Sequence, residues 1–146
     1  MATNSTLETD EQEVLAANHA FYHALQSLDL AQMEPVWLHE DWVECLHPGW
    51  ELIVGWEEIR ESWESVFRST GRMQVTTSRT LVHVRGDTAW VSCIENITAS
   101  HKEGFSSAMI EATNIFVRHQ GVWRLVHHHT STLPGRVPSG TSASVQ

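Results

Sequence analysis

The sequence contains few of the residues from which nucleic-acid binding surfaces are built. Only nine of its 146 residues are Lys or Arg, against 18 Asp and Glu, and the net charge is −9 at pH 7. Lys102 is the only lysine, and the basic residues form no run. Because a nucleic-acid footprint needs clustered Lys and Arg, we expect no nucleic-acid partner.

Cysteine and long apolar segments are also scarce. Cys45 and Cys93 are the only two cysteines, which is too few for a disulfide framework and favours a reducing compartment. Residues 1–13 are acidic and polar, without the apolar segment of a signal peptide. No apolar run approaches the ~20 residues of a membrane span. We therefore expect a cytoplasmic protein with no membrane partner.

Several catalytic motifs are missing from the sequence as well. It has no glycine-rich phosphate loop, no nucleophile elbow, no Ser–His–Asp order and no CxxC pair. In contrast, seven tryptophans and ten histidines are many for this length. These residues either line a pocket or serve in ordinary core and interface packing, where large aromatic side chains are common.

The composition predicts one globular domain. Hydrophobic residues make up 41% and charged residues 18% of the chain, and the length fits a single domain. We expect a disordered N-terminus over residues 1–9 and one domain over 10–133. Pro, Gly, Ser and Thr are frequent after that, which predicts a flexible tail over 134–146.

Hydrophobic periodicity predicts three helices in the first half of the chain. Val14, Phe21, Tyr22 and Leu25 have helical spacing within residues 10–28. A short second helix is expected before Pro35, which cannot continue a helix interior. Residues 56–67 form a third, amphipathic helix in which apolar positions alternate with glutamates at helical spacing.

The remaining segments predict strands. Residues 42–47 alternate and end at a Pro–Gly turn. After residue 71 the period changes to two, over 73–85, 88–99, 107–119 and 122–132, with breaks short enough for antiparallel hairpins. The order α-α-β-α-β-β-β-β predicts an α+β fold, with three N-terminal helices on one face of a strongly curved, mainly antiparallel sheet.

Two stretches resemble known families. The "HPGW" segment at residues 47–50, with "GW" at 55–56 and "SW" at 62–63, resembles bacterial SnoaL-like sequences. The stretches "TTSRTLVHVRGDTAWVSCI" and "WRLVHHHTS" resemble the association domain of calcium/calmodulin-dependent protein kinase II. Both families belong to the nuclear transport factor 2-like superfamily, which also includes ketosteroid isomerase. The resemblance implies a cone-shaped fold with a pocket between the inner sheet face and the helices.

The sequence departs from the functional residues of these relatives. The resemblance places Asn114 and Thr130 where the kinase association domain has arginines that bind small carboxylates. Ketosteroid isomerase uses a tyrosine with two aspartates, whereas this chain has a single tyrosine, Tyr22, and no aspartate between Asp41 and Asp87. A direct copy of either site is therefore not expected.

Candidate catalytic residues follow from strand alternation and from the expected pocket. His128, whose unperturbed pKa lies near neutrality, is the leading candidate for acid–base work, with a satisfied structural histidine as the alternative. Glu44 and His47 on the first strand are further candidates, because a carboxyl group in an apolar cavity gains a raised pKa. The alternative for Glu44 is a position facing solvent.

Other residues are candidates for the pocket wall. Alternation places Arg124, Val126, His128 and Thr130 on one strand face and Trp123, Leu125, His127, His129 and Ser131 on the other. Aromatic walls suit a flat apolar ligand. The predicted ligand-binding residues are Trp50, Trp56, Trp63, Trp90, Asn114, Phe116 and Tyr22.

His127 and His129 could also bind one metal ion, because residues i and i+2 of a strand share a face. His83 or Glu95 would then supply a third ligand. The alternative is a pair of hydrogen-bonded sheet or interface histidines, and we expect no metal and no cofactor.

Three functions are compatible with the sequence. The first is a small-molecule binder or a cofactor-independent enzyme that transfers protons, as isomerases, dehydratases and cyclases do. Its partners would be a small apolar or aromatic molecule and a second copy of the chain in a homodimer. The alternative is an oligomeric association domain, and the third option is a metal-dependent enzyme using His127 and His129.

Overall fold

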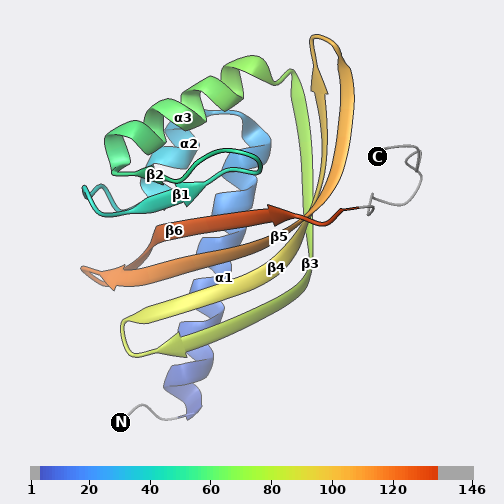
Figure 1. The fold of residues 1–146 in the computed structure, drawn as a ribbon. Helices are drawn as coiled ribbons and strands as arrows, with labels where there is room; N and C mark the ends of the chain where they lie inside the picture. The colour runs from blue at the N-terminus through green and yellow to red at the C-terminus, as the bar shows by residue number, and fades with distance from the viewer. Residues whose placement is uncertain (1–3, 135–146) are drawn as a thin grey trace.

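A computed structural model describes residues 4–134 of the chain. Figure 1 shows the helices gathered on one side of a bent sheet. The elements in chain order are α1 (Asn4–Ser27), α2 (Leu30–Met33), the 3-10 helix η1 (Glu34–Val36), β1 (Glu44–Leu46), β2 (Ile53–Val54), α3 (Trp56–Ser69), β3 (Arg72–Arg85), β4 (Thr88–His101), β5 (Gly104–His119) and β6 (Val122–Thr132).

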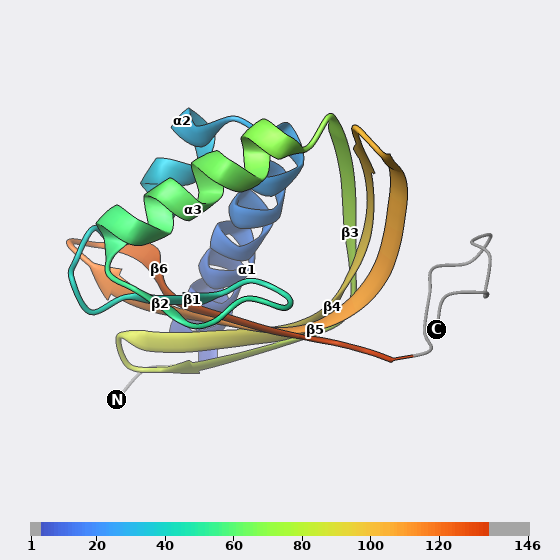
Figure 2. The ribbon, with the colours of Figure 1, turned by 45° about the horizontal axis from the view of Figure 1, so that its top comes forward.

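The sheet has six strands in the order β2-β1-β6-β5-β4-β3. The four long strands pair antiparallel, and β1 joins the edge of β6 in parallel. The sheet bends strongly, so that part of β3, β4 and β5 stands upright beside α3 (Figure 2). The predicted α+β architecture, with three helices on a mainly antiparallel sheet, is confirmed.

Some of the observed elements differ from the prediction. Helix α1 begins at Asn4, so residues 4–9 are helical and not disordered. Thr9, which has the residue type of an N-cap, lies inside the helix and donates to the Ser5 carbonyl at 3.0 Å. Strand β2 was not predicted, because two residues are too short to show a period, and it exists only through pairing with β1. The predicted tail, apart from Pro134, lies outside the described residues.

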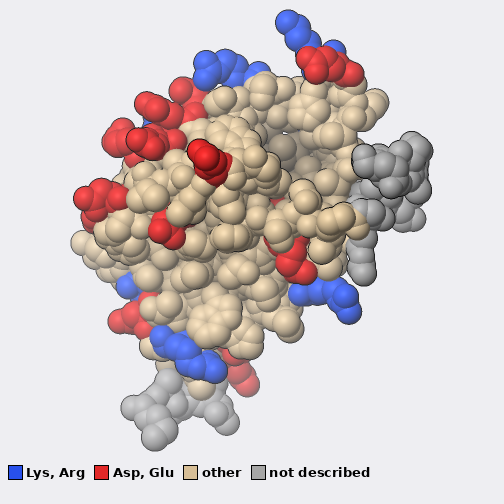
Figure 3. All heavy atoms as spheres, in the orientation of Figure 1, with Lys and Arg blue, Asp and Glu red and all other residues tan. Residues whose placement is uncertain are grey.

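The core lies between the helices and the concave face of the sheet. Phe21 from α1, Trp63 from α3, and Phe116 and Leu125 from the sheet are among its fully buried side chains. The opposite face of α3 carries Glu57, Glu58, Glu61 and Glu64, all exposed. Figure 3 shows the acidic side chains gathered over this part of the surface. The apolar spacing of α3 thus positions Trp63 between the helix and the concave face of the sheet.

One row of residues runs across the convex face of the sheet. The register aligns His83 with Trp90, Trp90 with Ile115, Ile115 with His127, and His127 with Glu44. On β1 and β4 the chain neighbours of row members, including Cys45, Ala89 and Val91, are buried on the concave side. The row therefore faces outward, because successive strand residues point to opposite faces.

An irregularity in β6 changes the predicted alternation. The register with β5 shifts between Ile115 and Phe116, which leaves Val126 as an extra residue between Leu125 and His127. Leu125 and Val126 are consequently both buried, although they are neighbours in sequence. The predictions that Trp123 and Leu125 share the face of His127, and that Arg124 shares the face of His128, are therefore wrong, because a β-bulge resets the alternation.

Candidate functional site

A buried polar cluster lies inside the cone. The Tyr22 hydroxyl, on α1, donates to Oε2 of Glu95 on β4 at 2.7 Å. The same hydroxyl lies 3.3 Å from the Cys93 sulfur. Tyr22 is 6% and Glu95 2% exposed. Because Glu is rarely buried to this extent unless paired, a carboxyl group here requires an explanation beyond packing.

Asn114 links this pair to His128. The Asn114 Nδ2 group donates to Asn18 Oδ1 at 2.9 Å and to the Tyr22 hydroxyl at 3.0 Å. Both amide hydrogens are then used, so Asn114 Oδ1 accepts from His128 Nδ1 at 2.6 Å. His128 thus carries its proton on Nδ1 and presents an unprotonated Nε2, which lies 3.9 Å from Glu95 Oε2.

Burial sets the protonation of this cluster. Desolvation raises the pKa of Glu95 to about 7, although the hydrogen bond from Tyr22 acts in the opposite direction. Burial lowers the pKa of His128 well below its ordinary value, and the neighbouring histidines, His47 first among them, lower it further. Desolvation, followed by the Glu95 charge, raises the pKa of Tyr22. At neutral pH, His128 is therefore uncharged and Glu95 is close to half-ionised. The two groups thus do not form a fixed ion pair.

His47 lies next to this cluster, across Trp63. Its ring meets Trp63 edge-on, with centroids 4.5 Å apart, and Trp63 lies 6.2 Å from His128. Ser62 donates to the Ile59 carbonyl, so its hydroxyl oxygen accepts from His47 Nε2 at 2.8 Å. Burial lowers the pKa of His47 to about 4. His47 is consequently uncharged at neutral pH, and its Nε2 proton is used in the hydrogen bond to Ser62.

The structure brings together part of the predicted site. Tyr22, Asn114 and His128 belong to the buried cluster, with Trp63 and His47 beside them. Phe116 is fully buried in the surrounding core. These residues come from α1, α3, the residue after β1 and the two strands β5 and β6, so only the folded chain assembles them.

Other predicted residues lie elsewhere. Glu44 and Trp90 belong to the convex row, where Glu44 Oε1 lies 2.9 Å from His127 Nδ1 and Trp90 stacks on His83. The expectation that Glu44 lies in a tryptophan-walled interior is therefore not met. Trp50 is 45% exposed, and its ring packs edge-to-face against the His47 ring. Trp56 stacks on His39 at the start of α3.

Sequence reasoning overlooked Glu95 as an acid–base group and considered it only as a metal ligand. The available signal was a lone acid in an otherwise uncharged strand, between Ile94 and Asn96. The rings of His127 and His129 stack with centroids 5.7 Å apart. Within residues 4–134, no group of three or more His, Cys, Asp or Glu side chains has an arrangement that could hold a metal ion.

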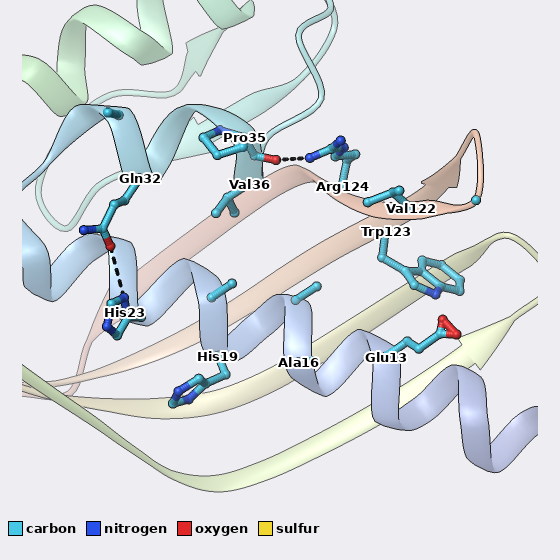
Figure 4. Close-up of a pocket in the computed structure, with 14 residues that line it drawn as sticks. Glu13, Ala16, His19, His23, Gln32, Pro35, Val36, Val122, Trp123 and Arg124 are labelled. Carbon is cyan, nitrogen blue, oxygen red and sulfur yellow. Dashed lines mark hydrogen bonds between the residues drawn. The ribbon is translucent and has the colours of Figure 1, made fainter.

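Four surface pockets bear on ligand access. None of these four is lined by His128, Glu95 or Asn114. A groove of about 500 Å³ between α1 and β3 is lined by Asn18 and Tyr22, two members of the buried cluster. A second pocket, between α1, α2 and the start of β6, is drawn in Figure 4.

In the described part of the chain, no helix is long and apolar enough to cross a membrane.

Comparisons with known proteins agree with this fold. A model of the SnoaL-like domain matches residues 14–135. A crystal structure of a candidate dehydratase from the nuclear transport factor 2-like family of Streptomyces avermitilis is 33% identical. It has a TM-score of 0.83 and covers 88% of this chain and 99% of that one. A candidate calcium/calmodulin-dependent protein kinase type II association domain from Thiobacillus denitrificans is 32% identical. Its TM-score is 0.68, with 81% and 93% of the two chains covered.

A curated relative matches most of this chain. The F-box protein SKIP8 of Arabidopsis thaliana is 30% identical over 122 residues, which cover 82% of this chain and 49% of the relative. This chain thus spans about half the length of that protein. The domain match extends from within α1 to the end of β6 and includes the whole buried cluster. The chain therefore belongs to the SnoaL-like domain family, within the nuclear transport factor 2-like superfamily.

Proposed function

We propose that this protein binds a small, largely apolar molecule inside the cone and moves a proton on it without a cofactor. The observation that carries the proposal is the buried Glu95, whose pKa is raised to about 7, facing the unprotonated Nε2 of a neutral His128. An acid–base group is most effective when its pKa lies near the working pH. Perturbed pKa values of this kind are concentrated at functional sites.

The roles of the cluster follow from its hydrogen bonds. Glu95 takes up or gives the proton, and His128 Nε2 is the second proton acceptor. Tyr22 and Asn114 are positioning residues, because they hold the carboxyl group and the imidazole ring through direct hydrogen bonds. Asn18 fixes the Asn114 amide in turn. This division of work is typical of proton transfer in isomerases and dehydratases, the latter being the type of enzyme suggested for the Streptomyces relative.

The groove between α1 and β3 supports access to the cluster. It is lined by Asn18 and Tyr22, and none of its lining residues is Asp, Glu, Lys or Arg. An uncharged wall favours a neutral ligand over a phosphorylated one, because a buried phosphate needs cationic or backbone N–H partners. The proposed substrate is therefore a neutral molecule that loses or gains a carbon-bound proton.

The test uses 5-nitrobenzisoxazole, a flat apolar probe that opens when a base removes its carbon-bound proton. The base takes the proton, the N–O bond breaks, and a nitrile and a coloured phenolate form. The unmodified protein should accelerate this reaction, with a rate that rises as the pH passes about 7. Glu95→Gln should reduce the rate by about 10²-fold or more, whereas Glu44→Gln should retain it. No acceleration, or equal loss in both variants, would contradict the proposal.

Association is a second candidate function. The convex row exposes the half-buried apolar side chains of Trp90 and Ile115 beside His127. The Thiobacillus relative is described as an association domain and is 32% identical. Light scattering on the purified chain separates the two functions. An assembly larger than a dimer favours association, and a dimer or monomer favours the small-molecule function.

A further inference from the structure

The pocket drawn in Figure 4 lies outside the cone and shares no residue with the buried cluster. It has a volume of about 810 Å³, which is within the range of small-molecule sites. Its walls come from one side of α1, from α2 and η1, and from the first residues of β6. We name this site the α1–β6 pocket.

Small side chains create the hollow. Ala16, Ala17 and Ala20 on α1 face Ala31 on α2, where larger residues would fill the space between the two helices. Pro35, Val36 and Val122 extend this apolar surface toward β6. The floor is therefore apolar over most of its length, which favours a ligand with a hydrocarbon body.

Polar side chains also line the pocket, namely Glu13, His19, His23, Gln32 and Arg124, and His23 and Gln32 are joined by a hydrogen bond. Arg124 is the one Lys or Arg residue that lines the pocket, and its guanidinium group donates to the Pro35 carbonyl. That bond holds the side chain over η1, and within residues 4–134 the guanidinium group makes no other hydrogen bond, so its remaining N–H groups can bind an anion. Glu13 is the one Asp or Glu residue in the lining. In Figure 4, Arg124 points toward Pro35, Glu13 lies beside the Trp123 ring, and His23 with Gln32 lies at the opposite end of the pocket.

Among the described residues, three buried tryptophans, Trp37, Trp63 and Trp123, have an unpaired indole N–H, and the one that lines this pocket is Trp123. It is 5% exposed, and its Nε1 group has no hydrogen-bond partner within the described residues. Figure 4 shows its indole ring directed from β6 toward α1. The Arg118 guanidinium covers the ring at 4.8 Å and is itself held by Asp10 and Asp87, so the ring orientation is fixed. An unpaired buried donor is costly, and an acceptor supplied by a ligand would remove that cost.

We propose that the α1–β6 pocket binds an amphipathic monocarboxylate with a hydrogen-bond acceptor at its far end. The carboxylate binds Arg124, because guanidinium groups bind carboxylates through charge-assisted hydrogen bonds. The hydrocarbon body covers the alanine floor. Glu13 repels a carboxylate from the Trp123 side, which fixes the direction of the ligand, and the distal acceptor binds Trp123 Nε1.

The first test measures binding of ω-hydroxyoctanoate by titration calorimetry and by amide chemical shifts in NMR spectra. Binding should be saturable, with shifts at residues 16–20 and 121–124. Arg124→Gln should weaken it tenfold or more, since hydrogen bonds to charged groups contribute about 1.5–3 kcal/mol. Arg72→Gln, which removes an exposed arginine outside the pocket, should leave binding unchanged.

A second pair of variants tests the floor. Ala20→Leu fills the hollow at an exposed helix position where Leu is well tolerated, so it should abolish binding without unfolding the chain. Gln12→Leu adds the same side chain outside the pocket and should bind normally. Full binding by Ala20→Leu, no saturable binding by the unmodified chain, or shifts only around Glu95 and His128 would each overturn the proposal.

The Trp123 contact is tested by comparing two ligands. Octanoate lacks the distal hydroxyl, so it should bind severalfold more weakly than ω-hydroxyoctanoate, as expected for one neutral hydrogen bond. In Trp123→Phe this difference between the two ligands should disappear. Because both ligands are compared on the same variant, any change in its stability does not affect the ratio. Equal affinity for the two ligands in the unmodified chain would remove Trp123 from the site.

Discussion

The Tyr22 hydroxyl lies 2.7 Å from Oε2 of Glu95 and joins the first helix to the second long strand of the sheet. Both side chains are buried, and they are 73 positions apart in the sequence. This bond stabilises the charged form of the carboxyl group, which the burial of Glu95 disfavours. The contact therefore links the packing of α1 to the protonation of the candidate site.

Tyr22→Phe should raise the pKa of Glu95 above about 7, because the hydrogen bond that lowers it is removed. Loss of a buried hydrogen bond should also reduce the free energy of unfolding by about 1–3 kcal/mol. NMR titration of the Glu95 side-chain carboxyl carbon measures the pKa, and urea unfolding measures the stability. A double-mutant cycle with Glu95→Gln isolates the pairwise interaction. A lower pKa of Glu95 in Tyr22→Phe would contradict the prediction, because it would mean that the hydrogen bond does not stabilise the charged carboxylate.

Glu95 should make stability depend on pH. Its folded pKa of about 7 exceeds the ordinary value of 4.5, so the folded chain binds this proton more tightly than the unfolded chain. The stabilisation is present below pH 4.5 and is lost as the pH rises through 7. The shift corresponds to a change on the order of 3 kcal/mol.

The measurement is urea unfolding at several pH values for the unmodified chain, Glu95→Gln and Glu44→Gln. The difference between the unmodified chain and Glu95→Gln should grow from pH 5 to pH 8, with Glu95→Gln gaining relative stability. Glu44→Gln should follow the unmodified chain. A difference that does not vary with pH would show that Glu95 ionises as in the unfolded state.

Ser62→Ala should destabilise the fold through His47. Without the serine oxygen, the buried Nε2–H of His47 has no acceptor, which costs about 1–3 kcal/mol. Ser65→Ala, at an exposed position on the same helix, should have little effect. Denaturant unfolding of the two variants at pH 7 compares them directly, and equal stability would mean that the His47 hydrogen bond contributes nothing.

The folded pKa of His47 is about 4, below its ordinary 6.5, so its contribution to stability has the opposite sign to that of Glu95. It is present above pH 6.5 and is lost as the pH falls toward 4. His47→Gln should therefore remove part of the acid destabilisation. The slope of stability against pH between 4 and 6.5 measures this contribution, and an unchanged slope in the variant would contradict it.

Ile115→Lys should dissociate any assembly formed through the convex sheet face. Ile115 lies in the middle of the row from His83 to Glu44, and a charge there would be desolvated on sheet-to-sheet contact. Size-exclusion chromatography with light scattering gives the mass of each species. Gln12→Lys, at an exposed position on α1, is the matched control. An unchanged mass for Ile115→Lys, in a chain that assembles, would place the interface elsewhere.

Local pattern was sufficient for most of the architecture. The helical spacing of residues such as Ile59 and Trp63, and the period of two after residue 71, depend on short-range geometry that a sequence displays directly. The long strands, the third helix and the α+β class were therefore predictable. The start of α1 and the short strand β2 were not, because helix ends and two-residue strands carry little periodic signal.

The site was only partly predictable, because alternation gives two strand faces but not which one is inside. His128 was assigned to the interior, and its contacts with Asn114 place it there. Glu44 was chosen over Glu95 because it lay near aromatic residues in sequence. Its face is set by the parallel pairing of β1 with β6, a contact between segments 83 positions apart.

The sequence by itself determined the elements, their order and the family, since these rest on local periodicity and on motifs along the chain. The tertiary structure alone decided which acid is buried, which histidine is neutral and which faces meet. Burial and hydrogen bonding depend on distant residues, as the contacts of Tyr22 with Glu95 and of Asn114 with Asn18 illustrate. Desolvation then fixes the protonation states from which the proposed chemistry follows.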